Sequence, residues 1–561
     1  MGFRPATLGV AASSVLAATL LTPGAAAAAP PRIHAITDAR IVVGPGRVIE
    51  RGTLVLRDGL VEAVGPGVAV PPDATVVAAE EGWTVYPAFI DAASAVGLEP
   101  EPNGAAPAPR GAEPRPVGSR HELKSVHPED RVVDRIDLSS TSVARHRELG
   151  FAVAHVLPDK GVFRGESALL LLDDGPAPEV VLRGQLGQVM ALETSSFMAR
   201  QYPSSKFGAV ATVRQVLLDA QRLAEWQRRY AASPAGMAPP GYRTSDAPLL
   251  ALLAGDRLPV FVAINALDPG RFGALAREFG LPALTVARGL GDRPADLLAA
   301  GTPLLLPLAM PEKPALGDPD EVIETSLEDL QQYLLAPRLP AALDAAGARV
   351  AFVTAGMDNP RSFQENLAAV VEAGLPPDRA LAALTTVPAA LLGVTGSMGT
   401  LEPGKLANVL VVQGELFTAK PAFRHRFVAG EHEEIEVPET LGNPDARADP
   451  RGIWDISSRV MGRASESTWT ITGEPDPDGK TGRYSGHSES ERAGKRPFTS
   501  IEQQGDALTV TTAGGPGGET RLTVIVDGDK LSGSTTMTSE RGSVTMQVEG
   551  RRTTGPEGVQ Q

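Results

Sequence analysis

The feature that most constrains the fold is a regular alternation in the middle of the chain, where short apolar segments are each followed by an amphipathic one. The apolar segments predict strands at 259–264, 282–287, 303–306 and 350–354. The amphipathic segments predict helices at 272–279, 294–300, 362–373 and 377–384. Strands that are apolar on both faces are typical of a parallel sheet covered by helices on each side. The alternation therefore predicts an α/β fold.

The stretch 84–98, TVYPAFIDAASAVGL, predicts the strand that opens this pattern. Successive side chains of a strand point to opposite faces of the sheet. Asp91 and Ala93 are therefore expected to share the interior face with Ala95, and Ser94 is expected on the opposite face. Further strands are predicted at 151–157 and 168–172, on either side of the loop DKGVFRGES. A helix is predicted at 207–230, with an apolar stripe made of Val210, Val213, Leu217, Ala220 and Ala224.

Segments with β character flank the alternating region on both sides. Residues 33–77 contain short β-segments, with a hairpin predicted around Asp58-Gly59, and 407–414 contains another. Residues 99–120 are rich in Pro, Gly and Ala and predict a flexible insertion. Near the C-terminus, alternating segments between Gly and Asp turns predict a separate antiparallel β-domain, either a sandwich or a small barrel.

Three motifs carry a family resemblance. The first is 84–98, and the others are LAALTTVPAALLGV at 381–394 and LEPGKLANVLV at 401–411. The matching residues of the first motif are Pro87, Ile90 and Asp91. Together the motifs resemble the amidohydrolase superfamily, in particular its imidazolonepropionase-like, metal-dependent hydrolases. The resemblance implies a TIM-like (β/α)₈ barrel beside a composite β-sandwich, and a reaction in which metal-activated water hydrolyses a C–N bond.

The patterns and the resemblance together predict five parts. They are a signal peptide at 1–29, a composite β-sandwich from 30–85 and 395–435, a barrel at 86–394, a linker at 436–451 and a C-terminal β-domain at 452–561. The signal peptide is predicted from an apolar run that ends in AAAAAP. It indicates export to the periplasm or the extracellular space, with no membrane attachment after cleavage. An uncleaved membrane anchor is the alternative interpretation of the same apolar run.

The residues that the resemblance would assign to metal binding are missing. Alanine stands at the superfamily's metal-ligand or catalytic positions in three strands, at Ala93, Ala95, Ala263 and Ala355, and either Ala287 or Arg288 stands near the position in the sixth strand. The chain has eight histidines, and none lies between Val156 and Arg424. The superfamily implies a divalent metal, but its histidine ligands are not found, so no metal site is predicted and no cofactor is assigned.

Three residues are nevertheless candidates for catalysis: Asp91, Asp358 and His155. Each has a structural alternative, since a buried carboxylate can be a hydrogen-bond acceptor, Asp358 can cap a turn or helix, and His155 can be a satisfied interior histidine. Arg164 and Arg288 are candidates for ligand binding and for the counter-charge of Asp91.

Charge and cysteine content limit the kinds of partner and chemistry that are expected. A formal net charge of -15 argues against a nucleic-acid partner, because binding phosphates needs a basic face. The absence of cysteine excludes disulfides and thiolate chemistry. A small-molecule ligand, a homo-oligomer or pairing with an active homologue all stay open. Two functions follow: a hydrolase acting on non-peptide or cyclic amide C–N bonds, with a degenerate metal site, or a non-catalytic barrel, a pseudoenzyme, that binds a ligand or an active homologue.

Overall fold

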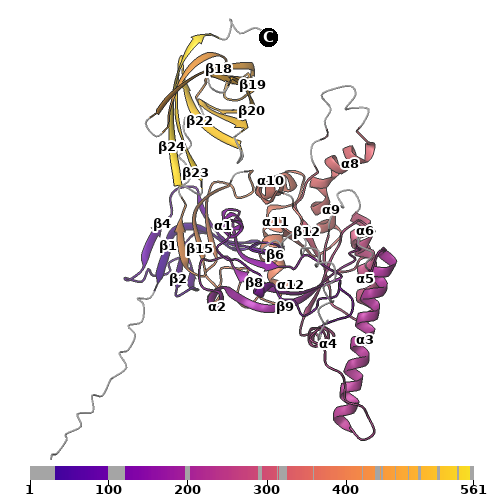
Figure 1. Cartoon of the computed structure of the whole chain (residues 1–561). Helices are drawn as coiled ribbons and strands as arrows, with labels where there is room; N and C mark the ends of the chain where they lie inside the picture. The colour runs from indigo at the N-terminus through magenta and orange to yellow at the C-terminus, as the bar shows by residue number, and fades with distance from the viewer. Residues whose placement is uncertain are drawn as a thin grey trace, which may run out of the picture. The chain divides into compact units, whose positions relative to one another are not determined.

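The computed structural model describes residues 32–98, 120–195, 202–287, 294–311, 314, 325–357, 359–419, 421–435, 443, 446–460, 463–477, 479–490, 494–513, 519–539 and 542–555. The chain divides into two compact units, Met1–Ile435 and Glu436–Gln561, which are described separately below (Figure 1). The predicted signal peptide lies outside the described residues. Across the described ranges, every helix is too short or too polar to cross a bilayer.

The first unit contains a mixed sheet built from both ends of its sequence. Its strands run in the order β16-β15-β14-β5-β1-β2-β3, and β4 pairs with β1. The bounds are β1 Ile33–Gly44, β2 Arg47–Arg57, β3 Leu60–Gly65, β4 Thr75–Ala78, β5 Trp83–Pro87, β14 Val409–Gln413, β15 Ala422–Val428 and β16 Glu431–Glu434. The hairpin predicted at Asp58-Gly59 joins β2 to β3. Both turn residues have positive φ, 48° and 84°, as a two-residue turn between twisted strands requires.

The second sheet of this unit is barrel-like and has eight strands in the order β13-β12-β11-β10-β9-β8-β7-β6. The bounds are β6 Phe89–Ser94, β7 Phe151–Val156, β8 Phe163–Leu171, β9 Val181–Ala191, β10 Leu258–Val262, β11 Leu284–Val286, β12 Leu304–Pro307 and β13 Val350–Val353. The two end strands meet where the amide of Ala355 donates to the carbonyl oxygen of Ala93 at 2.9 Å. The sheet is therefore nearly closed.

One strand departs from the all-parallel (β/α)₈ pattern. β8 runs antiparallel to both β7 and β9, whereas the other neighbouring pairs of this sheet are parallel. A parallel connection needs a crossover of about a dozen residues or more. Only 157–162 separate β7 from β8, and 172–180 separate β8 from β9. These connections are too short for a crossover, so the chain turns back at both.

Helices follow most of the parallel strands (Figure 1). The bounds are η1 Val132–Asp134, α1 Thr141–Glu148, α2 Ala177–Val180, α3 Lys206–Ala232, α4 Asp246–Ala254, α5 Asp268–Phe279, α6 Pro294–Ala299, α8 Leu327–Leu335, η3 Ala336–Arg338, α9 Leu339–Ala345, η4 Pro360–Ser362, α10 Phe363–Glu372, α11 Pro377–Leu384 and α12 Thr386–Leu391. Ser205 caps α3, since its hydroxyl accepts from the amide of Gly208 at 3.2 Å. Of the predicted stripe on α3, Val213, Leu217 and Ala220 are buried, whereas Ala224 is exposed.

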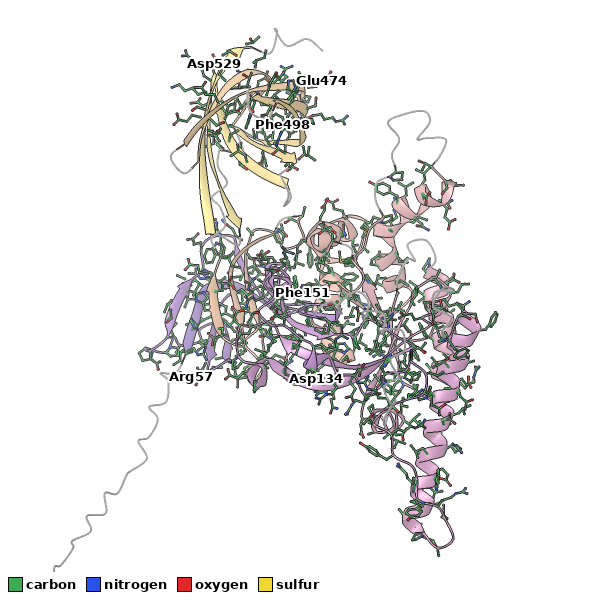
Figure 2. The ribbon with its side chains drawn as sticks, viewed as in Figure 1. Arg57, Asp134, Phe151, Glu474, Phe498 and Asp529 are labelled. Atoms are coloured by element: carbon green, nitrogen blue, oxygen red, sulfur yellow. The ribbon has the colours of Figure 1, made fainter. Side chains whose placement is uncertain are left out.

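Aromatic side chains connect the barrel-like sheet to its helices. Phe151, labelled in Figure 2, packs between Phe89 and Phe363, with ring centroids 5.9 and 5.1 Å away. All three phenylalanines are fully buried. Burying such rings removes a large apolar area from water, so this cluster is a main source of stability where β6, β7 and α10 meet.

The second unit is a closed antiparallel barrel of eight strands, β17 to β24, each paired with its sequence neighbours. The bounds are β17 Gly452–Val460, β18 Arg463–Pro475, β19 Gly482–Ser490, β20 Gly494–Gln504, β21 Ala507–Ala513, β22 Glu519–Asp527, β23 Lys530–Ser539 and β24 Gly542–Thr554. Trp454 and Ile456 are buried, while Asp455 and Ser457 between and after them are exposed. This alternation matches the predicted β pattern, and of the two predicted architectures the barrel is the one observed.

Candidate functional site

Asp91 lies in β6, at the edge where β6 approaches β13, and is fully buried. Its Oδ1 accepts from the backbone amides of Ala93 and Thr354, both at 3.2 Å. Its Oδ2 accepts from the Thr354 hydroxyl at 2.5 Å, and Nε2 of His146 lies 3.5 Å from the same oxygen. A carboxylate has about four lone-pair positions, and three hydrogen-bond donors engage those of Asp91 across both of its oxygens.

Ser94 joins the same cluster, although simple alternation predicts it on the opposite face from Asp91. The pairing of β6 with β7 is irregular here, because Asp91 lies opposite Ala154 while Ser94 lies opposite Val156. Three residue steps on β6 therefore match two on β7, which is the count of a β-bulge. The bulge interrupts the two-residue alternation, so the Ser94 side chain joins the cluster around Asp91. The prediction that Ser94 lies on the opposite face was wrong.

His146, on α1, completes the cluster. Its Nε2 lies 3.2 Å from the Ser94 hydroxyl and 3.0 Å from the Thr354 hydroxyl, and its Nδ1 lies 3.1 Å from the carbonyl oxygen of Ser142. A carbonyl oxygen only accepts, so Nδ1 carries the proton. A neutral ring then accepts at Nε2 from Ser94, and a charged ring donates there to Thr354. We call Asp91, Ser94, His146 and Thr354 the β6–β13 seam.

The seam contains a serine, a histidine and an aspartate, but not in the arrangement of a nucleophilic triad. In such a triad the carboxylate orients the ring through Nδ1, while the nucleophile contacts Nε2. Here Asp91 and Ser94 both approach Nε2, and a backbone carbonyl occupies Nδ1. Ser94 is also only 1% exposed. The geometry suits a structural hydrogen-bond network that joins β6, β13 and α1.

His155, a predicted catalytic candidate, is fully buried in β7 and makes its hydrogen bonds away from Asp91. Its Nδ1 donates to the carbonyl oxygen of Ala92 at 2.8 Å, and its Nε2 lies 2.7 Å from the Ser167 hydroxyl. Burial lowers the pKa of His155 to about 4. The ring is therefore neutral near pH 7, and the Ser167 hydroxyl occupies its free lone pair, as the structural alternative for this residue predicts.

Of the two arginines expected near Asp91, Arg164 pairs with a different carboxylate. Its guanidinium lies 3.1 Å from Glu193, and its side chain is 11% exposed. Arg164 therefore pairs with Glu193 and not with Asp91, so its predicted role as the counter-charge of Asp91 is wrong. Backbone amides and a hydroxyl donate to Asp91 instead. Arg288 and Asp358, the other predicted site residues, lie outside the described residues.

The donor set does not fit the metal centre that the resemblance implies. Ala93, Ala263 and Ala287 are buried and offer no side-chain ligand. Among the described residues of the seam, the one carboxylate is that of Asp91, which already accepts from the groups described above. Within the described ranges, no group of three His, Asp or Glu residues is arranged to hold a metal ion. A metal ligand must keep a lone pair directed at the ion. Both oxygens of Asp91 and both ring nitrogens of His155 are instead in hydrogen bonds with protein groups.

A second group of histidines lies in the mixed sheet, where His34, His425 and His432 are in contact. Nδ1 of His425 and Nε2 of His432 are 3.1 Å apart, and the rings of His34 and His432 have centroids 5.2 Å apart. Burial is the main cause that lowers the pKa of each of the three imidazoles. We call these residues the β1–β15–β16 histidine patch. Nearby charges include Arg32, Arg424 and Glu434.

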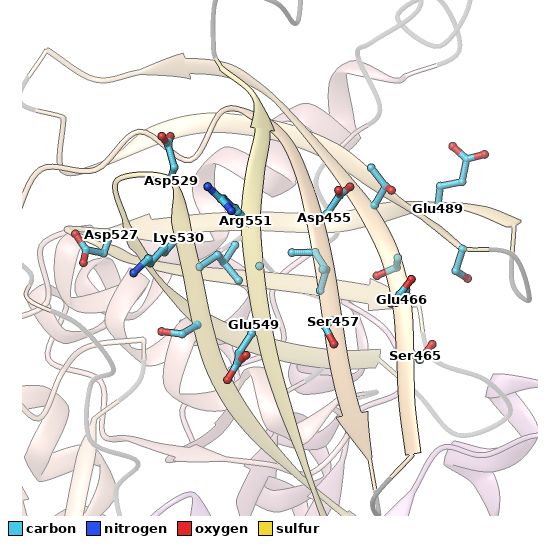
Figure 3. A pocket seen from close by; sticks show the side chains of 17 residues that line it. Asp455, Ser457, Ser465, Glu466, Glu489, Asp527, Asp529, Lys530, Glu549 and Arg551 are labelled. Atoms are coloured by element: carbon cyan, nitrogen blue, oxygen red, sulfur yellow. The ribbon is translucent and has the colours of Figure 1, made fainter.

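Two prominent cavities lie among the described residues, and both are lined by residues other than those of the seam. One, of about 180 Å³, lies between α9, β13 and α11. The other, of about 1890 Å³, belongs to the second unit and is shown in Figure 3. Its lining is rich in hydroxyl and charged side chains, among them Asp455, Glu466, Glu489, Glu549, Lys530 and Arg551.

Comparison with known proteins gives one family and several similar folds. Residues 336–432, which run from η3 into β16, match the model of the Amidohydrolase family. An amidohydrolase from Thermotoga maritima MSB8 is 20% identical, with a TM-score of 0.57, and the similarity covers 71% of this chain and 98% of that one. No curated protein matches.

Two more distant structures are a Xaa-Pro dipeptidase with bound methionine in its active site and phenylurea hydrolase B. The dipeptidase is 13% identical with a TM-score of 0.39, and covers 72% of this chain and all of its own. The hydrolase is 14% identical with a TM-score of 0.39, and covers 73% of this chain and all of its own. The T. maritima structure supports the architecture of the first unit. The family match includes the motifs at 381–394 and 401–411, whose similarity to a known family was visible in the sequence.

Proposed function

We propose that this chain is a member of the amidohydrolase superfamily with a degenerate metal site, whose barrel binds a ligand or a partner without hydrolysing it through metal-bound water. The family match over 336–432 supports the membership, and the similar fold of the T. maritima amidohydrolase agrees with it. The superfamily's reaction needs ligands that hold a metal ion and leave one coordination position for water. The β6–β13 seam supplies a network of satisfied hydrogen bonds where those ligands would stand.

The observation that carries this proposal is the set of contacts around Asp91. A ligand or general base must have a lone pair available to the metal or to the substrate. The amides of Ala93 and Thr354 and the Thr354 hydroxyl already engage both oxygens of Asp91. To release the carboxylate, the protein would have to break several buried hydrogen bonds, and each would leave an unpaired polar group.

A second candidate is retained hydrolysis of an amide C–N bond, on a non-peptide or cyclic substrate. It is favoured by the family match over 336–432, which includes the final strand of the barrel-like sheet. In this case Asp91 would act together with Asp358, as a pair of carboxylates. His155 would contribute only after leaving Ala92 and Ser167, since both of its ring nitrogens contact them.

Metal content and hydrolysis, measured on the same preparation, distinguish the two candidates. The full-length protein would be dialysed, analysed by inductively coupled plasma mass spectrometry, and assayed with and without added Zn²⁺, Mn²⁺ or Ni²⁺ on N-acyl amino acids, Xaa-Pro dipeptides and cyclic imides. We expect no stoichiometric metal and no turnover. Bound metal together with turnover, both lost in Asp91→Ala or Asp358→Ala but kept in the surface control Asp73→Ala, would establish the hydrolase.

We also propose that the protein is exported and that residues 1–29 are removed. The apolar run and the A-x-A pattern before Pro30 support cleavage near Ala29 or Pro30. Intact-mass measurement of the exported protein tests this, because a chain that still begins at Met1 contradicts it. Association with a second copy or an active homologue is part of the same proposal, and light scattering of the purified protein, alone and mixed with such a homologue, tests it.

A further inference from the structure

The smaller cavity of the first unit lies at the opposite end of β13 from the seam. Val350, which begins β13, and Phe352 line it, whereas Thr354, just after β13, belongs to the seam. The other walls come from α9 and α11, so the cavity lies between the barrel-like sheet and its outer helices. Any ligand here would therefore occupy a place separate from the seam.

Most of the wall is apolar, and its inner part is buried. Phe352 is 1% exposed, Leu375 3% and Ala383 5%. Protein interiors pack to the density of organic crystals, and voids larger than a water molecule are few. A cavity of about 180 Å³ is large for a packed interior. Even a cavity of about 150 Å³ is known to hold a benzene molecule. The space here is sufficient for a compact apolar group.

The charged residues of the lining are two arginines and one aspartate. Nε of Arg379 donates to Oδ1 of Asp344 at 2.6 Å, so these two charges neutralise each other. Arg349 is exposed, and its side chain makes no hydrogen bond or ion pair within the described part of the chain. The lining thus carries one positive charge that no described carboxylate matches. Arginine binds carboxylates through two parallel N–H donors, which makes it the natural partner of an anionic head group.

We propose that this cavity binds a small organic monocarboxylate with a compact apolar body. The apolar body packs against Phe352 and the alanines of α11, and the carboxylate pairs with Arg349. A neutral molecule of the same shape gains the apolar contacts alone, and a cation is opposed by Arg349. The proposal does not depend on whether the barrel hydrolyses a substrate, because none of the seam residues takes part.

The test uses the full-length protein with benzoate, benzyl alcohol and benzylamine as probes, measured by isothermal titration calorimetry and by saturation-transfer NMR. We expect benzoate to bind at least tenfold more tightly than benzyl alcohol, and benzylamine not to bind. Arg349→Gln should weaken benzoate at least tenfold and leave benzyl alcohol unchanged. Arg222→Gln, at an exposed arginine of α3, is the matched control and should leave both probes unchanged.

A second variant tests the cavity itself. Ala383→Leu adds a side chain that fills part of the space, and it should abolish binding of both benzoate and benzyl alcohol while the circular dichroism spectrum stays native. Equal affinity for benzoate in the native protein and in Arg349→Gln would overturn the proposal, as would the absence of benzoate binding at millimolar concentration. Because Arg349 is exposed, its replacement is not expected to unfold the protein, so the first comparison remains decisive if Ala383→Leu misfolds.

Discussion

The barrel-like sheet of the first unit and the barrel of the second, each of eight strands, close in different ways. β17 and β24 pair along their length, from Ile453 opposite Thr554 to Val460 opposite Met546, so backbone hydrogen bonds complete the second barrel. Among the described residues, β6 and β13 share no such ladder, and the backbone bond from Ala355 to Ala93 joins them beside the side chains of the seam. In the barrel-like sheet, buried polar side chains therefore join the two end strands, where the second barrel uses backbone pairing.

The interiors differ accordingly. The first unit buries Asp91, His155 and Glu166 at 1% exposure or less, whereas the core of the second is built from Trp454, Ile456, Leu508 and similar apolar residues. A buried polar network stabilises a fold only while each of its members is satisfied, but an apolar core tolerates changes of pH and charge. The first unit should therefore be the more sensitive to single polar substitutions and to acid.

The largest effect is expected from Asp91→Ala. Removing this carboxylate leaves the Thr354 hydroxyl and two buried amides without their acceptor, and breaking a buried network of this kind costs about 3–5 kcal/mol. Calorimetry, with hydrogen exchange to assign each transition, should show the first unit destabilised and the second unchanged. Trp454→Ala is the matched variant, and it should destabilise only the second unit by about 3–5 kcal/mol. A loss below about 1 kcal/mol for Asp91→Ala would contradict the closure role of the seam.

The next effect is the response to acid. Burial holds the pKa of His155 at about 4 in the folded protein, below its ordinary value of 6.5, so the unfolded chain binds more protons between these two values. This contribution to stability is complete above about pH 6.5 and is lost as the pH falls toward 4. Between pH 7 and pH 5, the free energy of unfolding of the first unit should fall by about 2 kcal/mol more in the native protein than in His155→Asn, as measured by urea unfolding. An equal pH response in the two proteins would contradict this assignment.

A smaller and more local effect is expected at β16. Because burial lowers the pKa of His34, His425 and His432, protonation in acid weakens the patch, and stability there falls with falling pH. The three rings are only partly buried, so solvent screening should keep the loss below about 1 kcal/mol. Hydrogen exchange of 431–434 should accelerate at pH 5, and less so in His432→Asn. His487→Asn, in the second unit, should not alter that exchange, and uniform acceleration across the mixed sheet would contradict a local effect.

The smallest effect concerns separating the two units. The second barrel closes on its own ladder, so we expect residues 446–555 expressed alone to fold as a soluble β-protein. Its unfolding temperature should match that of the second transition in the full-length protein within about 2 °C. Circular dichroism and calorimetry of the isolated segment measure this. A disordered product would show that the second unit needs the first in order to fold.

Sequence patterns were sufficient where strands are apolar and helices amphipathic. The predicted strands at 259–264 and 350–354 overlap β10 and β13, and the predicted helix at 377–384 is α11. β8 was predicted only from Ala168, yet it begins at Phe163, because its first residues include the polar FRGES. Glu166 and Ser167 are buried there, with partners in Arg257, Gln185 and His155 supplied by other strands and loops. Propensity along the chain cannot reveal partners that tertiary structure supplies.

The candidate site was predicted in part, for the same reason. Asp91 was identified because it lies in a motif, and its structural alternative as a hydrogen-bonding residue matches its contacts. Ser94, His146 and Thr354 were missed as a group. The bulge in β6 redirects Ser94, and His146 reaches the seam from a helix about 50 residues further along the chain. No local sequence signal encodes the bulge or the approach of His146. The position of His146 on a short helix close to a motif strand was nevertheless a reason to include it among the candidate residues.

The antiparallel β8 also bears on how the first unit folds. β7, β8 and β9 form a continuous meander within residues 151–191, so their contacts join positions close in sequence. The parallel pairs of the same sheet must each wait for a crossover to form, and long loops slow such encounters. The meander is therefore the segment best placed to form early and to act as a template on which β6 and β10 add from either side. The reversal that departs from the all-parallel pattern would thus give this sheet a nucleus of low contact order.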